Sequence, residues 1–128
     1  MVTVKDHLAM MAPPLRATVQ SARRAVRAAA PGARETACQS KPPRSKGPMW
    51  KISRYFLGET EFAAIGTFST HAHLYFRRGV ELDDGSGLLE GGGKTLRSIR
   101  LNTPLDAARP EVKRTIRRAC QLARVQFL

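Results

Sequence analysis

Residues 62–101 carry the clearest strand signals in the chain and its densest glycine cluster. In residues 71–76, apolar side chains alternate with His71, His73 and Tyr75, so these three share one face of a strand. Residues 62–68 form the strand before it, and residues 69–70 are either a tight connection or part of a bent strand pair. Adjacent strands with such short links are antiparallel. The fold must therefore be organised around an antiparallel sheet.

Two further strands extend this sheet. Residues 49–57 have apolar residues at strand density, and residues 58–61 form the turn that follows. Residues 95–101 form the fourth strand, and their imperfect alternation is compatible with a bulge. Its apolar candidates are Leu96, Ile99 and Leu101.

Helices are expected on the N-terminal side of the sheet. Residues 3–11 predict a short helix with Thr3 as its N-cap. A second helix begins near Pro14, because proline is tolerated in a first turn, and it ends just before Pro31. The face beside its apolar stripe is interpreted as solvated and carries Arg16, Arg23 and Arg27.

A third, strongly amphipathic helix is expected at the C-terminal end, starting at Pro110. Its apolar residues recur at offsets 0, 4, 7, 11 and 15, which is one helical face: Val112, Ile116, Ala119, Ala123 and Phe127. Runs of strands flanked by helices indicate an α+β fold, with an antiparallel sheet of about four or more strands packed against the N-terminal and C-terminal helices. The length of 128 residues predicts a single domain over residues 1–128.

Residues 33–48 give the weakest signals. Residues 33–40 predict a short helix that carries Cys38 toward the core. Residues 41–48 contain three prolines and one glycine and predict a flexible basic loop. The only other cysteine is Cys120, and we expect both thiols to stay unpaired, because they fit no metal spacing and isolated cysteines are usually small buried apolar residues.

The net charge of +12 is the most unusual global property of the chain. A basic surface attracts nucleic acid and other anions through counterion release. The alternative is compositional, because 16 of the 22 basic residues are arginine, as expected from a GC-rich genome. The aromatic fraction of 6% argues against an extended base-stacking platform, for which Tyr75 is the one candidate.

No apolar run approaches the roughly 20 residues that a membrane-spanning helix needs. Asp6 and His7 stand where a signal peptide would need an apolar core, so no export signal is expected. These features predict a cytoplasmic location and no membrane partner. The oligomeric state is left open, with a homodimer as one possibility.

The glycine turn at residues 91–94 is the first candidate site. A phosphate-binding P-loop is excluded, because the residue five places before Gly93 is Leu88 and not glycine. Consecutive glycine N–H groups can still form an anion-binding nest beside a cation. The candidate anion ligands are Gly91, Gly92, Gly93, Lys94 and Arg97.

His71 and His73 are the second candidate site, because two histidines on one strand face can converge on a metal ion such as iron. A third ligand would have to come from Glu61, Glu90 or another carboxylate. No catalytic set is evident, and no cofactor is indicated. The sequence therefore favours a non-enzymatic binding domain for an anionic ligand or a protein partner, with a metal-handling protein using His71 and His73 as the alternative.

One pattern extends from the third strand to the fourth: H-x-x-L-x-F, then R-G-x-E-L, then G-L-L-E-G-x-G-K-x-x-R. It resembles the YdhG-like family of small bacterial domains of unknown function, and it implies a helix–sheet–helix plan. Some members of that family are described as frataxin-like iron chaperones, but iron loading needs an acidic surface, which a chain at +12 lacks. The matching motif residues include His71, Arg78, Gly79, Glu81, Glu90, Gly91, Gly93, Lys94 and Arg97.

An upstream part of the family pattern, E-x-x-x-W-G-x-P, has two possible matches. Glu35 and Pro42 fit it if Gln39 replaces the tryptophan. Residues 47–50 fit it if the basic loop before them is an insertion, and we prefer this match because it places Trp50 at the start of a strand.

Overall fold

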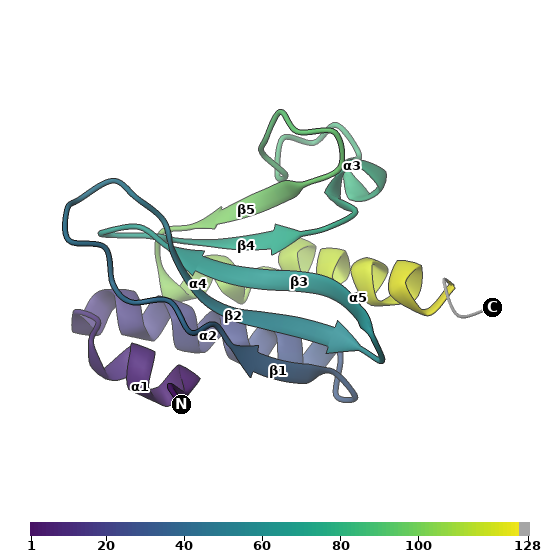
Figure 1. Cartoon of the computed structure of the whole chain (residues 1–128). Helices are drawn as coiled ribbons and strands as arrows, with labels where there is room; N and C mark the ends of the chain where they lie inside the picture. The colour runs from purple at the N-terminus through teal and green to yellow at the C-terminus, as the bar shows by residue number, and fades with distance from the viewer. Residues whose placement is uncertain (126–128) are drawn as a thin grey trace.

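A five-stranded antiparallel sheet forms the centre of the computed structural model, which describes residues 1–125 (Figure 1). Each strand pairs with the next one in sequence, so the sheet order is β1-β2-β3-β4-β5. The predicted α+β class and antiparallel sheet are confirmed. The strands are β1 (Arg34–Ala37), β2 (Trp50–Leu57), β3 (Thr60–Thr67), β4 (Ala72–Phe76) and β5 (Arg97–Leu101).

Three of the four predicted helices are present, together with two short ones that were not predicted. Thr3 caps the first helix as predicted, in a reciprocal capping box with Asp6. The predicted C-terminal helix is also confirmed, although Phe127 lies outside the described residues. The helices are α1 (Val4–Ala9), α2 (Pro13–Ala29), α3 (Gly79–Leu82), α4 (Pro104–Ala107) and α5 (Pro110–Val125).

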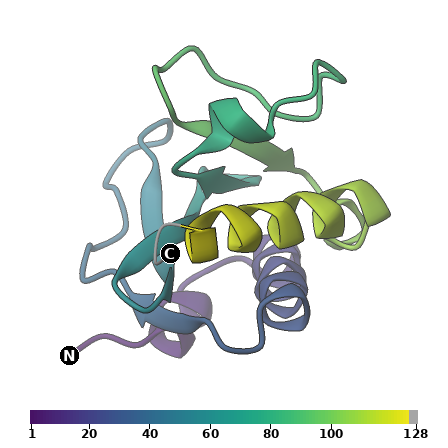
Figure 2. The ribbon, with the colours of Figure 1, turned by 90° about the vertical axis from the view of Figure 1, so that its right-hand side faces the viewer.

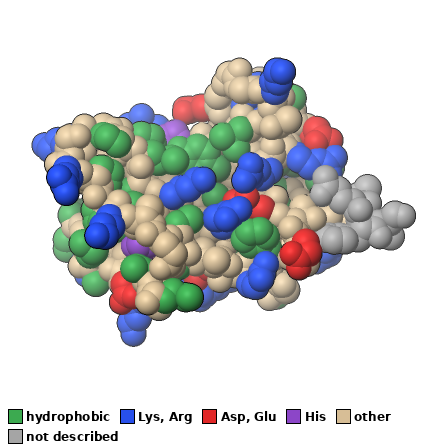
Figure 3. Space-filling model, in the orientation of Figure 1, with side chains coloured by type: hydrophobic (Ala, Val, Ile, Leu, Met, Phe, Trp, Pro, Cys, Tyr) green, Lys and Arg blue, Asp and Glu red, His purple; other side chains and the backbone are tan. Residues whose placement is uncertain are grey.

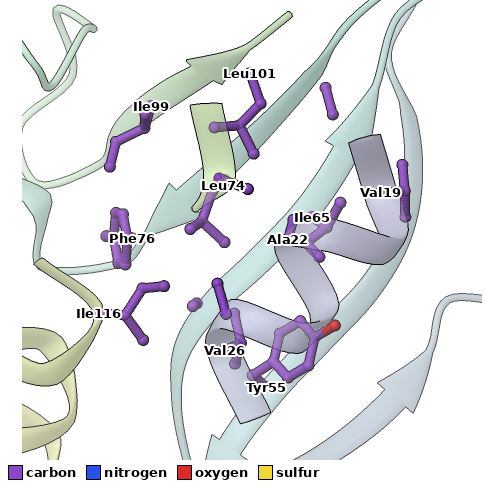
Figure 4. Packing of buried hydrophobic residues seen from close by; sticks show 14 of the residues in the cluster. Val19, Ala22, Val26, Tyr55, Ile65, Leu74, Phe76, Ile99, Leu101 and Ile116 are labelled. Carbon is purple, nitrogen blue, oxygen red and sulfur yellow. The ribbon is translucent and has the colours of Figure 1, made fainter. Parts of the chain in front are cut away.

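The two long helices lie on the same side of the sheet, where α2 contacts β4 and α5 contacts β2 and β3 (Figure 2). The buried apolar side chains of both helices and of the inner sheet face form one cluster (Figure 4). Leu74, Phe76 and Ile116 are fully buried at its centre. Burial of a side chain of this size contributes about 1.5–3 kcal/mol, so this cluster holds the helices on the sheet.

The helix predicted for residues 33–40 is wrong, because Arg34–Ala37 is strand β1. Arg34 pairs with Phe56 and Ala37 with Ser53, and the ladder continues through Cys38, whose N–H donates to Ile52 O at 2.9 Å. Local propensity at this position is overridden by pairing with β2, which satisfies the backbone groups of the segment.

The bulge considered for residues 95–101 is not found in the pairing of β4 with β5, and the register shifts lie in β2 instead. The β4–β5 register is continuous, whereas β2 shifts register between Lys51 and Ser53 and again between Tyr55 and Phe56. The first shift explains why Ile52 and Ser53 are both buried. In β5, Ile99 and Leu101 are buried as predicted, but Leu96 precedes the strand and is exposed.

Residues 69–70 are the tight connection between β3 and β4, since Phe68 N–H donates to His71 O at 2.8 Å. Both cysteines are free thiols; Cys120 is buried, as predicted, and Cys38 is half-buried. Among the described residues, no helix is both long enough and apolar enough to cross a membrane.

Candidate functional site

One face of the sheet has no helix over it within residues 1–125, and we call it the open face. Residues that pair across neighbouring strands point to the same side of a sheet. Ala64 pairs with Tyr75, and Gly66 pairs with His73, so these four residues belong to the open face. Figure 3 shows basic side chains spread over this face, with hydrophobic side chains between them.

Four rings form a continuous row along β4 on the open face. The Phe68 and His71 rings stack at 4.9 Å between centroids, with 12° between their planes. His71 lies 5.2 Å from His73, and His73 lies 5.7 Å from Tyr75. All four side chains are half-buried, so each keeps part of its ring accessible to a ligand. We call this set the aromatic row.

Beside the aromatic row the sheet has a shallow hollow of about 210 Å³ over Ala64. Gly66 creates room next to it, because a Cβ there would lie 2.7 Å from Met49 Sδ and 3.1 Å from Tyr75 Cε2. Met49, Tyr75 and Leu96 form its apolar walls. The space that glycine leaves is thus filled by two larger side chains that reach across the sheet.

Basic side chains outnumber acidic ones on the open face. Lys51 and Arg77 stand at the rim of the hollow, and Glu61 is already held there by Arg54 at 3.1 Å and Arg77 at 2.6 Å. These partners lower the pKa of the Glu61 carboxyl against the effect of burial, so it stays ionised. Lys51 has no carboxylate partner among the described residues, so its charge is available to a ligand.

The pKa values of both histidines of the aromatic row are lowered, which favours their neutral form. Burial is the main cause that lowers the pKa of both His71 and His73, with Arg100 acting in the same direction and Glu90 opposing it. His73 is also fixed by a 2.9 Å hydrogen bond between its Nδ1 and Ser98 Oγ.

Lowering the pH below 6.5 is expected to destabilise the protein through these histidines. Their folded-state pKa values lie below the ordinary value of 6.5, so the unfolded chain binds protons first. Their contribution to stability is therefore complete above that pH and is lost as the pH falls toward the folded values. Urea unfolding across this range should show a flatter pH dependence in a His71→Gln plus His73→Gln variant. Equal slopes for parent and variant would contradict this expectation.

The structure brings the two predicted metal ligands together without a third. Within residues 1–125, no three His, Cys, Asp or Glu side chains are arranged to hold a metal ion. Glu61, the first carboxylate considered for this role, is bound by two arginines. A metal site at His71 and His73 stays a prediction with two protein ligands.

The glycine turn places its candidate anion ligands at the surface, apart from the open face. Arg97 Nη1 donates to Gly93 O at 2.7 Å and to Leu96 O at 2.8 Å, so this guanidinium is turned onto the carbonyl oxygens of its own loop. Gly91, Gly92 and Lys94 are exposed. An anion would have to compete with these carbonyls for Arg97, and the site stays a prediction.

Gly79, a residue of the family pattern, marks a close contact between α3 and the start of β5. A Cβ on Gly79 would lie 2.5 Å from Arg97 N and 2.8 Å from Arg97 Cα. Val80 N–H also donates to Thr95 O at 3.0 Å. Only glycine allows this approach of two backbones.

Other residues of the pattern also make structural contacts here. Arg78 Nη2 donates to Glu81 Oε1 at 2.6 Å, and Arg78 Nη1 donates to Leu122 O at 3.0 Å, which ties α3 to α5. Glu90 pairs with Ser98 through two backbone hydrogen bonds of 2.7 and 2.9 Å. The pattern therefore describes a joint that holds α3, β5 and α5 together.

Sequence reasoning identified His71, His73 and Tyr75 but missed Phe68 and Met49. The missed residues lie just outside β3 and β2, where strand alternation no longer indicates a face. The signal that could have found Met49 is Gly66, since a glycine inside a strand often marks a close approach of other groups.

A comparison of the chain with protein-family models, with curated protein sequences and with solved structures gave no match.

Proposed function

We propose that the protein is a non-enzymatic binding domain whose open face binds a segment of single-stranded nucleic acid. The observation that carries this proposal is the aromatic row beside basic side chains on a sheet face that no described helix covers. Single-strand binders combine cationic grooves for the phosphates with rings on which bases stack. The open face has side chains of both kinds, basic and aromatic, which supports this proposal.

Charge favours a polyanion over a second copy of this chain. The protein carries +12, and its open face shares that sign, so two copies would repel one another there. A strand of nucleic acid instead gains from the release of its counterions. An acidic protein would also be attracted by the positive charge, but it has no bases to stack on the rings of the aromatic row.

A single strand fits this face better than a duplex. The rings and the hollow between Met49 and Tyr75 suit flat, unpaired bases. Lys51, at the rim of the hollow, has no carboxylate partner within residues 1–125, and it would contact the phosphates of the same strand. The row is short, so a bound segment of only a few nucleotides is expected.

Labelled single-stranded oligonucleotides in a fluorescence polarisation assay test this proposal. Binding is expected at about 50 mM salt and should weaken steeply as salt is raised. Lys51→Glu should weaken binding about tenfold, and Tyr75→Leu should do the same through lost stacking. Lys113→Glu is the matched control, because Lys113 lies on α5 and exposes the same charge away from the open face.

Three outcomes would count against the proposal. If no oligonucleotide bound at low salt, the proposal would be wrong. Equal weakening by Lys51→Glu and Lys113→Glu would show that only total charge matters, which is the compositional explanation. If an acidic peptide bound more tightly than any oligonucleotide, the ligand of the open face would be a protein and not a nucleic acid.

We also propose that the chain belongs to the YdhG-like family. This membership is supported by the way in which the motif residues Arg78, Gly79, Glu81 and Glu90 meet at one joint. A joint of this kind describes how the chain folds and assigns no reaction to it.

A further inference from the structure

A cleft of about 540 Å³ lies between residues 84–90, the end of β5, α4 and α5. Four of the ten acidic residues of the chain line it, although the protein as a whole is strongly basic. Four arginines line it as well, so the formal charges of the cleft balance. A balanced cleft on a protein of +12 is the feature that needs an explanation.

Three of the four carboxylates have partners within the protein. Glu111 accepts from Arg109 Nη2 at 2.6 Å, and Asp106 accepts from the backbone N–H groups of Asn102 and Thr103 at 2.8 and 3.1 Å. Asp84 accepts from Ser86 N–H at 2.9 Å, which shapes the loop. These groups are held in the local structure.

Glu90 and Arg114 are different, because the side chain of neither makes a hydrogen bond or an ion pair with any residue from 1 to 125. They are opposite charges that line one cleft without reaching each other. Arg118 lies one helical turn after Arg114, and a 3.1 Å hydrogen bond from its Nη1 to Leu82 O leaves its other N–H groups available. The wall of the cleft thus carries an unpaired carboxylate, that of Glu90, and guanidinium N–H groups of Arg114 and Arg118 that have no acceptor within residues 1–125.

We propose that this cleft binds a zwitterionic small molecule, whose ammonium group meets Glu90 and whose carboxylate or phosphate meets Arg114 and Arg118. A simple anion would face four carboxylates, and a simple cation would face four guanidinium groups. A zwitterion satisfies both unpaired charges, and arginine pairs with carboxylate or phosphate through two parallel hydrogen bonds. Leu88 and Ile99 provide apolar wall for the carbon chain between its two groups.

The test is calorimetry of the whole chain with 6-aminohexanoate and phosphoethanolamine, which separate the carboxylate and phosphate sources of the anion. Hexanoate and hexylamine are the single-charge comparisons. We expect at least one zwitterion to bind with a Kd on the order of 1 mM, and the single-charge compounds to bind about tenfold more weakly. Amide NMR shifts at Gly87 and Leu88 should locate the bound molecule in the cleft.

Matched variants decide whether the two free charges do the binding. Glu90→Gln and Arg114→Gln should each weaken zwitterion binding about tenfold without changing the melting temperature. Lys113→Gln removes an exposed charge from the same helix outside the cleft and should leave the affinity unchanged. Lys51→Glu should also leave it unchanged, because Lys51 is not among the residues that line the cleft.

The proposal is overturned if no zwitterion binds up to about 10 mM, a limit that corresponds to a negligible affinity. It is also overturned if hexanoate binds as well as 6-aminohexanoate, since the ammonium would then have no partner. If Arg114→Gln and Lys113→Gln weakened the affinity for the zwitterion equally, the binding would depend on the overall charge of the protein and not on the cleft.

Discussion

Replacing Gly79 by alanine is expected to lower the free energy of unfolding by about 3 kcal/mol, the upper part of the range for overpacked sites. The new methyl group would have to displace the backbone of Arg97, which cannot move like the end of a flexible side chain. Since β5 begins at Arg97, the displacement would disturb the edge of the sheet. Differential scanning calorimetry should show a melting temperature about 10 °C lower for a chain of this size.

Gly92→Ala is the matched control for this prediction. Gly92 lies in the glycine turn at a position that the family pattern leaves free, and a Cβ there would meet no atom within 4 Å. The expected change is within about 0.5 kcal/mol. If Gly79→Ala cost no more than Gly92→Ala, the close contact of α3 with β5 would not be a determinant of stability.

Much of the fold could be predicted because its elements follow strong local rules. In β4, alternation alone separates the buried Leu74 and Phe76 from the aromatic row. Strand β1 could not be predicted in this way, because its four residues have no apolar alternation and depend on pairing with β2. A segment that is stabilised mainly by a partner distant in sequence leaves little signal in its own residues.

The candidate sites were less predictable than the fold. The sequence indicates that His71 and His73 share a face, but it gives no indication that Met49 reaches over Gly66 from before β2. The cleft is less predictable still, since Glu90 and Arg114 are far apart in sequence and line the same cleft only because α5 packs beside residues 84–90. Such sites depend on tertiary placement, which periodicity does not encode.

The arginine face of α2, interpreted as solvated, is only partly so. Arg16 donates to Leu8 O and Met11 O, each at 2.9 Å, and Arg23 belongs to a network that stabilises β1. The Arg23 side chain is 13% exposed and binds Glu35 with two hydrogen bonds of 2.9 and 2.7 Å. The buried Tyr55 hydroxyl donates to the same carboxylate at 2.7 Å. Arg27 also reaches it, at 3.2 Å, but its side chain is 62% exposed. One carboxylate therefore accepts four hydrogen bonds from three side chains of α2 and β2.

Replacing Glu35 by alanine is expected to cost about 2–3 kcal/mol, less than a fully buried ion pair because both partners keep some contact with water. The loss would leave the Arg23 guanidinium and the Tyr55 hydroxyl without their acceptor. Chemical denaturation measures the cost, with Arg27→Ala as the control, which should change stability by less than about 1 kcal/mol. A double variant, Arg23→Met plus Glu35→Leu, should recover much of the loss, because it removes both charges together.

The same network predicts an acid-dependent loss of stability. Arg23 and Tyr55 lower the pKa of the Glu35 carboxyl below its ordinary value of 4.5, although burial, the largest single effect, acts in the opposite direction. A carboxyl with a depressed folded-state pKa contributes stability above its unfolded pKa, and this contribution is lost as the pH falls through the folded value. The difference in unfolding free energy between the parent and Glu35→Gln should therefore be constant at neutral pH and shrink below about pH 4.5. A difference that did not change with pH would show that the carboxylate charge is not what Arg23 and Tyr55 recognise.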